Sequence, residues 1–532
     1  MDGPGGSSLR EPLLTGEGQS PLAGLGARVS AATERSPSSH RHSLHPEPSL
    51  RVYAARWRVL GIYCACAFVN QAIWLSFAPT AAEVAARFNV PLLAITSLNT
   101  SAAALFVPGA WLCARALAAV GLRRTVVLAA CAQAVGALVR CVADGLVRET
   151  VSRRAAFAVL STGQALASLA APVFLNLPPV IAEAWFDPSG REFAQAVGTI
   201  SSLLGQGAGS ALAGSLISGA RADGTFQLLF AQAALASALA LSAYVGFESA
   251  PPTPPSRAAE ASAARERGGS RSTLQLSASA ASLSTRALAD PIAGLDADPD
   301  DSGARGAGSP LAIWRALLCR PQFLLLLLAF NVGLGIAAAI MTLLGQMVEK
   351  CGYGPAIAGD ASGLFMLAGA AGAFVAARVL DRTRAYKATL RAVALGSSCS
   401  GALFMRAIRP GARAELLVCA ALLGAWTVAA LPVLIANAVE EAYPAPPDAP
   451  TALLFTSSNV LQVAFTFVLQ LLLTAQGDEC GDLASPSRAL IVGAAGVGCL
   501  LPVLAFDGAQ NRRIAEEAAE LERRVANEYG LG

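Results

Sequence analysis

Among the amide side chains that interrupt otherwise apolar stretches of the chain, ten need an explanation first. An amide inside hydrocarbon costs free energy unless it faces a water-filled cavity or a neighbouring helix. We therefore treat these residues as candidates for lining the path of a solute, with hydrogen bonding between helices as the alternative for each. The ten are Asn70, Gln71, Asn99, Gln164, Asn176, Gln206, Asn331, Gln346, Asn437 and Asn459.

Groups that relay protons are missing from the same stretches. All three histidines, His40, His42 and His45, lie near the N-terminus, so none can serve as a transmembrane proton relay or heme ligand. The middle parts of the first, fourth, seventh and eighth apolar stretches hold no carboxylate, and we expect Glu440 and Glu441 at a solvated helix end. Downhill uniport is therefore favoured over proton coupling.

Motifs for enzyme chemistry are missing as well. The sequence holds no phosphate-binding glycine loop, no metal-ligand cluster and no paired nucleophile and base, so we expect no enzymatic activity and no cofactor. The formal net charge is only +3 and the basic residues are scattered, so we expect no nucleic-acid partner.

The elements that position the amides are predicted to be membrane-spanning helices. The 532 residues are 54% hydrophobic and 14% charged, whereas a soluble domain carries about 25% charged residues. A helix needs about 20 apolar residues to cross a bilayer. Apolar windows predict twelve such helices, near residues 58–80, 91–114, 122–142, 155–182, 194–219, 226–246, 322–347, 357–380, 388–408, 414–438, 452–475 and 487–506.

A polar stretch divides these helices six and six. Residues 250–312 are rich in Ala, Ser, Arg, Pro and Asp without apolar periodicity, which is typical of a disordered linker. We therefore predict an all-α membrane protein of two six-helix bundles. Its expected parts are a disordered N-terminal tail (1–56), an N-terminal bundle (57–247), a disordered linker (248–316), a C-terminal bundle (317–507) and a C-terminal surface helix (508–532).

Basic residues predict the orientation. With an even number of helices both termini lie on one side, and short cytoplasmic loops are enriched in Lys and Arg. Such residues crowd the loops that follow the second and eighth helices, at Arg115, Arg123, Arg124, Arg382, Arg384 and Lys387. The tails and linker are therefore expected in the cytoplasm, although Arg148, Arg153 and Arg154 argue for the opposite orientation.

Most of the eleven cysteines lie in or beside apolar stretches, where a thiol behaves as a small hydrophobe. Cys351 and Cys480 instead fall in loops that we place outside. Sequence spacing constrains pairing only loosely, so a disulfide between these two residues stays open.

Two basic turns, residues 121–124 and 381–384, occupy equivalent places after the second and eighth helices, which indicates an internal repeat. They resemble the short cytoplasmic loop of the major facilitator superfamily, in which an Asp and basic residues clamp neighbouring helices in one state. Ordinary basic cytoplasmic loops are the alternative, and the first turn lacks the Asp. The resemblance implies gating roles for Asp381, Arg382, Arg384, Arg123 and Arg124.

A narrower resemblance rests on the run from Gly163 and Gln164 through Pro172, Asn176 and Pro178 to Trp185 and Arg191. This run resembles helices four and five of the feline leukaemia virus subgroup C receptor family, solute carrier family forty-nine. Residues 121–140, 331–347 and 441–444 agree, so the resemblance spans roughly residues 51–506. It implies the major facilitator fold and a carrier of choline or ethanolamine, of heme, or, in a lysosomal branch, of pyridoxine.

The resemblance also implies binding residues. Trp74 falls where the family places a tryptophan against a substrate cation, an attraction of roughly 2 kcal/mol without water; a lipid-interface anchor is the alternative. Two glutamines of choline carriers align with Leu203 and Asn459, and Ala338 stands near a family tyrosine, so the choline pattern is incomplete. Asn459 instead resembles the pyridoxine-type branch. The expected substrate-binding residues are Trp74, Asn459, Gln206, Asn331 and Gln164.

These observations predict a secondary transporter that moves a small organic solute across a membrane by alternating access, as a uniporter. The alternative is a non-transporting receptor or scaffold that acts through its linker and tails. The expected partners are the solute and the lipid bilayer, and a monomer is expected. We expect the plasma membrane, with an endolysosomal membrane as the alternative because residues 10–14 resemble an acidic dileucine signal.

Overall fold

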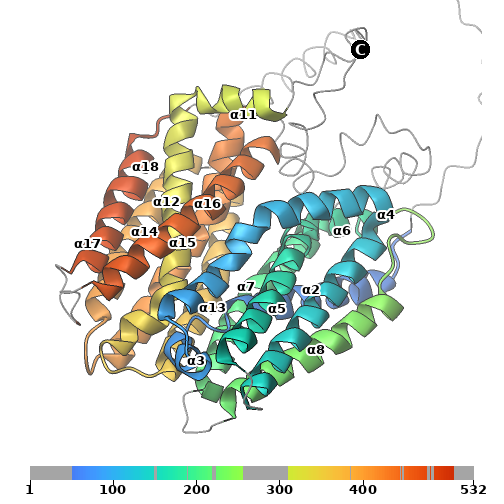
Figure 1. Cartoon of the computed structure of the whole chain (residues 1–532). Coiled ribbons are helices and arrows are strands. Elements are labelled where there is room, and N and C mark those ends of the chain that lie inside the picture. Colours follow the sequence, from blue (N-terminus) through green and yellow to red (C-terminus); the bar gives the residue numbers. More distant parts are fainter. Residues whose placement is uncertain are drawn as a thin grey trace, which may run out of the picture. The chain divides into compact units, whose positions relative to one another are not determined.

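The computed structural model shows a chain of helices (Figure 1). It describes residues 51–148, 152–187, 190–217, 223–255, 310–383, 385–443, 445, 448–475, 480 and 485–508. The predicted N-terminal tail up to residue 50, most of the linker and the C-terminal surface helix beyond residue 508 lie outside these residues, as do the three histidines and the dileucine-like run.

The helices before the linker form what we call the N-terminal half. They are α2 (Ala55–Leu75), α3 (Ala81–Phe88), α4 (Leu92–Arg148), α5 (Arg153–Asn176), α6 (Pro178–Trp185), α7 (Arg191–Ile217) and α8 (Gly224–Gly246). Within α4, Gly121 has a φ of 77°, which breaks the helix into two spans, Leu92–Leu117 and Ala119–Val147. Glycine suits this position because it has no Cβ to clash at positive φ.

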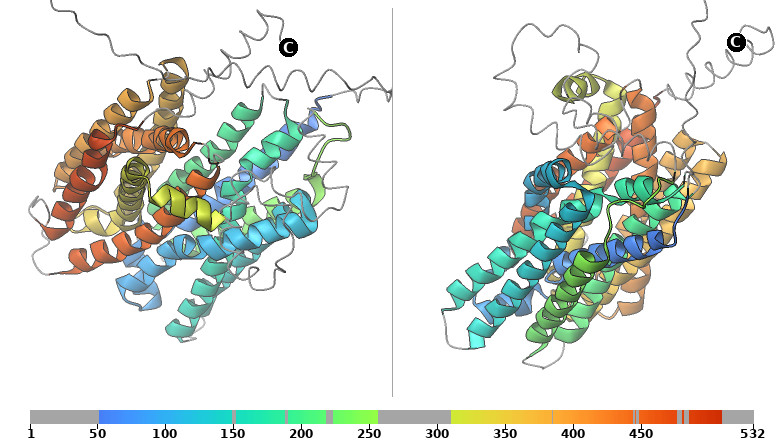
Figure 2. Two further views of the ribbon diagram at one scale, coloured as in Figure 1. Left: turned by 90° about the horizontal axis from the view of Figure 1, so that it is seen from above. Right: turned by 90° about the vertical axis from the view of Figure 1, so that its right-hand side faces the viewer.

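The helices after the linker form the C-terminal half. They are α11 (Pro310–Leu318), α12 (Pro321–Glu349), α13 (Pro355–Thr383), α14 (Tyr386–Ala407), α15 (Arg413–Ala442), α16 (Asp448–Thr474), α17 (Pro486–Gly493) and α18 (Leu501–Ala505), with a π-helical turn, η1 (Ala494–Leu500), between the last two. In Figures 1 and 2 the blue to green helices gather on one side and the yellow to red helices on the other.

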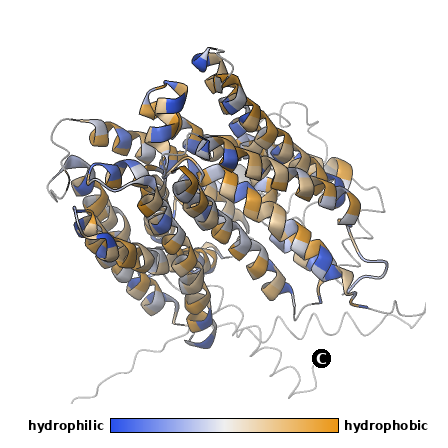
Figure 3. Cartoon of the chain, turned by 90° about the horizontal axis from the view of Figure 1, so that it is seen from below, coloured by the Kyte–Doolittle hydropathy of each residue, from blue (hydrophilic) through white to orange (hydrophobic). Residues whose placement is uncertain are grey.

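The predicted fold class is confirmed. Eleven of the described helical segments are long and apolar enough to cross a membrane, and hydrophobic residues run along their length (Figure 3). The twelfth expected span corresponds to α7, a helix of 27 residues that is interrupted by glycine and serine and is therefore less apolar.

Successive spans run in opposite directions, which defines two ends of the helices. We call the end where α2 begins and α18 ends the linker face, and the other end the opposite face. The opposite face carries the connections after Leu75, Glu349 and Thr474.

The first span ends earlier than predicted. We expected it to run to residue 80, but α2 ends at Leu75. Proline disfavours helical geometry in the residue before it, and Pro79 falls four residues later. The chain then forms the short helix α3, which the apolar windows did not predict because it is only eight residues long and amphipathic.

Two other predicted boundaries also differ from those in the structure. The expected fourth span is divided into α5 and α6 because Pro178 starts a new helix. Residues 310–316, predicted as disordered linker, belong to α11, whose side chains Ile313 and Trp314 pack on the core of the C-terminal half. In Figure 1, α11 runs crosswise to α12.

A disulfide joins the loops after α12 and α16 on the opposite face. Cys351 and Cys480 form it, with a Cα–Cα distance of 5.2 Å across 129 residues of sequence. Sequence reasoning left this pairing open.

Candidate functional site

Trp74 lies at the end of α2, since the helix stops one residue later. Its indole Nε1 donates a hydrogen bond of 2.7 Å to the backbone carbonyl of Asn99 on α4, and the side chain is half-buried. This bond uses the only polar group of the indole. What Trp74 still offers a ligand is the face of its ring.

A chain of amides links three helices of the N-terminal half. Gln206 of α7 donates to Gln71 of α2 (2.8 Å), Gln71 donates to its neighbour Asn70 (3.3 Å), and Asn70 donates to the carbonyl of Ala167 on α5 (3.1 Å). A carbonyl can only accept, so it forces Asn70 to present its NH₂ group. Each amide then orients the next, and Gln206 must turn its NH₂ group towards Gln71.

The other predicted binding residues have their own environments. Ser457 donates to Asn331 (3.0 Å), which ties α16 to α12, and Asn459 donates to the carbonyl of Phe455 in its own helix (2.9 Å). Gln164 is fully buried, and neither of its amide atoms has a hydrogen-bond partner. The structure thus shows no hydrogen bond between any two of the five predicted binding residues.

A polar junction joins the two halves towards the opposite face. The Thr96 hydroxyl of α4 donates to Gln470 of α16 (2.6 Å) and accepts a bond from Gln346 of α12 (3.1 Å). Helix α12 also approaches the end of α2 closely, because a Cβ on Gly345 would lie 2.6 Å from the carbonyl oxygen of Ala78.

Glycines bring α7 and α13 together beside this junction. A Cβ on Gly359 would lie 2.6 Å from the carbonyl oxygen of Ser210, and one on Gly207 would lie 3.0 Å from Cβ of Met366. On its other side α7 packs against α2, where a Cβ on Gly209 would meet the backbone of Ala72. These glycines thus permit close packing of α7 on both neighbours.

Two cavities open between the halves at the opposite face. One of about 320 Å³ is lined by Leu92, Gln346, Glu349, Lys350, Leu473 and Thr474. The other, of about 290 Å³, is lined by residues 79, 81–83, 345, 349 and 352–355. Glu83 in the second cavity has a raised pKa, first because burial disfavours its charged form and also because Glu349 is negative.

The sequence places this architecture in a known family. Residues 63–510 match the Major Facilitator Superfamily over most of the chain. The chain belongs to the major facilitator superfamily. Its relatives include solute carrier family 49 member A3 of Xenopus tropicalis, 26% identical, covering 88% of this chain and 90% of the relative. They also include the choline/ethanolamine transporters flvcr2a of Danio rerio (23% identical, covering 82% of this chain and 84% of the relative) and FLVCR1 of Mus terricolor (25%, 90% and 80%).

Solved structures agree on the fold. The nucleoside transporter NupG superposes with a TM-score of 0.56 at 12% identity, covering 84% of this chain and all of that one. A D-xylose-proton symporter gives 0.54 at 12% identity, covering 85% of this chain and 96% of that one. The chain is therefore a multi-pass membrane transporter and not an enzyme, as the sequence predicted.

The residues predicted to gate transport lie on the linker face. Within the part of the chain that the structure describes, they form no contact between the two halves. Arg123 donates to the carbonyl of Tyr244 within the N-terminal half (3.0 Å), while Arg124 and Arg382 are exposed. Arg384 and the side chain of Asp381 lie outside the described residues. Their gating role therefore stays a prediction.

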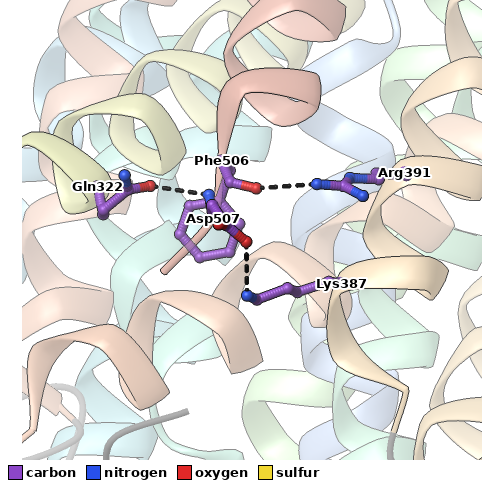
Figure 4. A network of polar contacts seen from close by, with 5 residues as sticks. All are labelled: Gln322, Lys387, Arg391, Phe506 and Asp507. Carbon is purple, nitrogen blue, oxygen red and sulfur yellow. Dashed lines mark hydrogen bonds and ion pairs between the residues drawn. The ribbon is translucent and has the colours of Figure 1, made fainter. Parts of the chain in front are cut away.

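A different polar network occupies the linker face of the C-terminal half (Figure 4). Lys387 of α14 forms an ion pair of 2.8 Å with Asp507, just after α18, and this bond lowers the pKa of Asp507. The backbone N–H of Asp507 donates to Gln322 (2.9 Å), and Arg391 donates to the carbonyl of Phe506 (3.3 Å). The network fastens the end of α18 to α12 and α14.

The sequence did not predict a buried charge pair that the structure shows. Asp144 is fully buried near the end of α4, where Arg87 of α3 donates to its carboxylate (2.8 Å). Glu441, expected at a solvated helix end, is only 8% exposed. Both lie within two turns of a span end, so apolar windows alone did not separate them from loop residues.

A buried arginine was missed as well. Arg140, one turn before Asp144 on α4, donates to Gln232 of α8 (3.1 Å) and Ser76 (2.9 Å), and its guanidinium lies 4.6 Å from the ring centroid of Phe77. These contacts hold the break after α2 to α4 and α8. Its position in an apolar run was the available signal.

Proposed function

We propose that this transporter is a uniporter for a small organic solute with a cationic or aromatic amine-like group, of the choline, ethanolamine or pyridoxine kind. The solute moves by alternating access, in which the two halves rock about a binding site near Trp74. The observation that carries it is the arrangement of Trp74, whose indole N–H is bonded to Asn99 so that the ring face is left for a ligand.

An aromatic face attracts a cation through its quadrupole, and the attraction grows when water is excluded. In support of the proposal, Trp74 comes three residues after Gln71 on α2 and is bonded to Asn99, three residues after Thr96 on α4. The relatives named choline/ethanolamine transporters support a solute of this class. Heme receives less support, because no histidine occurs in the predicted spans.

Uniport is supported by the state of the buried acids. Asp144 is held by Arg87, so its charge is already balanced. Glu441 is the other carboxylate that is buried among the described residues. Uptake by Glu441→Gln should match the wild type and should not follow an imposed proton gradient. Loss of gradient-driven uptake in this variant would instead establish coupling.

The test is uptake of labelled choline, ethanolamine and pyridoxine by vesicles containing the full-length protein. Trp74→Ala should lower uptake of the transported solute by about tenfold or more, since roughly 2 kcal/mol of cation–π attraction is lost, whereas Trp74→Phe should retain part of it. Trp426→Ala is the control, because Trp426 is 39% exposed on α15. Equal loss in both tryptophan variants, or none in either, would remove Trp74 from the site.

The compartment and oligomeric state belong to the same proposal. We propose a monomer in the plasma membrane, with an endolysosomal membrane as the alternative. Surface biotinylation of intact cells tests the compartment, and the mass of the detergent-solubilised particle tests the monomer.

A further inference from the structure

Asn99 on α4, like Gln164 on α5, carries a buried amide whose hydrogen bonds are unaccounted for. Asn99 is 1% exposed, yet neither its Oδ1 nor its Nδ2 has a partner. The polar residues around it on α4 are all bonded: Thr96 joins α12 and α16, Thr100 donates to the carbonyl of Thr96, and Ser101 contacts Ser168 of α5. The missing partners are thus a property of Asn99 and not of the helix.

The position of Asn99 follows from its spacing. It lies three residues after Thr96, and residues three apart share one face of a helix. Thr96 contacts the C-terminal half, so Asn99 lies on the same face, one turn further from the opposite face. Ser101, two residues on, points to α5 instead.

Asn99 is also the residue that anchors Trp74. Its backbone carbonyl accepts the indole N–H at 2.7 Å, so the indole of Trp74 is held against α4 at the residue that carries this amide. A buried amide without partners is costly, and native proteins satisfy such groups with a bond to protein, water or ligand. An amide supplies one acceptor and two N–H donors, and a hydroxyl can use both kinds.

We infer that the Asn99 side chain binds the hydroxyl group of the transported solute while the cationic part of that solute packs on Trp74. The inference rests on the proposed function and deepens it by assigning the residue that recognises a hydroxyl group near the charge of the solute. Asn99 is then a specificity-determining residue. The sequence alone did not distinguish it from amides that hydrogen-bond between helices.

The experiment compares Asn99→Leu, whose side chain has the same branching and the same number of heavy atoms, with the wild type and with Ser101→Ala, a control on another face of α4. Each full-length protein is tested for uptake of choline against ethyltrimethylammonium, and of ethanolamine against ethylamine, which lack the hydroxyl. Wild type and control should take up the hydroxylated probe about tenfold faster than its partner, which is the effect expected of one hydrogen bond. Asn99→Leu should take up both members of a pair at nearly equal rates, and Asn99→Ala should do the same.

The melting temperature without solute is the second readout. Asn99→Leu should melt at the same or a higher temperature than the wild type, because it removes an unpartnered amide. Retained discrimination between the probes, or a melting temperature lowered by several degrees, would overturn the inference. If the wild type takes up no probe, the proposed function is wrong, and the melting temperature of Asn99→Leu then decides the role of Asn99. A higher melting temperature than the wild type keeps Asn99 as a binding residue for another solute. A lower one makes Asn99 a structural residue.

Discussion

At the scale of single residues, the amide chain from Gln206 to Ala167 shows how one carbonyl can orient a distant side chain. Asn70 and Gln71 are positioning residues, since each forces the orientation of the next amide. The order of donors leaves the Gln206 carbonyl oxygen free to accept a hydrogen bond from a solute.

Because the chain acts as a unit, its variants should not add. Gln71→Leu and Gln206→Leu should each lower uptake by about tenfold, and the double variant by little more than either one. Initial uptake rates measure this, with Thr162→Val as a control because Thr162 is exposed and bonds only its own helix. A double variant with the product of the two losses would contradict the shared orientation.

The pair of Arg87 and Asp144 makes a stability prediction at the same scale. Asp144 is fully buried, so Asp144→Ala leaves the Arg87 guanidinium without its carboxylate and should cost about 3 kcal/mol. The double variant Arg87→Met with Asp144→Leu should recover most of this loss, because neither charge remains. Thermal unfolding of the purified protein measures both, and a double variant no more stable than Asp144→Ala would refute the pair's role.

At the scale of elements, the junction of α4 with α12 and α16 joins the two halves at the opposite face, and we describe this joined arrangement as closed. Thr96→Val keeps the shape of the side chain but leaves Gln346 and Gln470 without their hydroxyl partner, which should weaken closure by about 1–3 kcal/mol. A cysteine introduced at Ala82, in a cavity between the halves, should then react faster with an impermeant maleimide. Thr466→Val, whose hydroxyl bonds only the carbonyl of Gln462, is the matched control and should leave the rate unchanged.

Closure of the same face should depend on pH through Glu83. Burial and the charge of Glu349 raise its pKa in this closed structure. A carboxyl whose pKa is raised binds its proton more tightly when the face is closed, so closure strengthens as the pH falls from neutral towards about 5 and weakens as it rises. Lys350 and Tyr353 line the same cavities and belong to its surroundings.

The Ala82 cysteine should therefore be labelled more slowly in acid once the rate is corrected for thiol ionisation. Glu83→Gln should remove this pH dependence, since the amide does not titrate, while Glu415→Gln on α15, engaged with Arg409 (2.6 Å), should keep it. A pH dependence that survives in Glu83→Gln would assign the effect to another group.

At the scale of the whole molecule, the disulfide bears on orientation. Disulfides persist in oxidising compartments, and Cys351–Cys480 lies on the opposite face. We therefore propose that this face is extracellular or luminal and that the linker face is cytoplasmic, in agreement with the basic turns after the second and eighth helices.

Removing the disulfide should lower stability without changing the fold. It closes a loop of 129 residues, and loss of such a bridge typically costs about 2–4 kcal/mol. The double variant Cys351→Ser with Cys480→Ser should melt at a lower temperature, and an impermeant reductant should lower the melting temperature of the wild type to the same value.

The proposed orientation has its own test. An epitope inserted in the linker should be reached by antibody only after cells are permeabilised, and labelling of intact cells would reverse the orientation.

Local chemistry determined the membrane class and the approximate place of every span, because a run of about 20 apolar residues is a property of the sequence alone. The same holds for the family, whose motifs are contiguous runs such as residues 163–191. Even here the ends needed the structure: α2 stops before Pro79, and Trp74 therefore lies at its last turn.

Pairings between distant residues were decided only by the tertiary structure. Thr96 and Gln470 are 374 residues apart, and no periodicity in either helix indicates that they meet. The same is true of Arg87 with Asp144 and of Trp74 with the Asn99 carbonyl. A sequence reveals that an amide must be satisfied inside a membrane, but helix packing decides which amides find partners and which, like Asn99, are left for a solute.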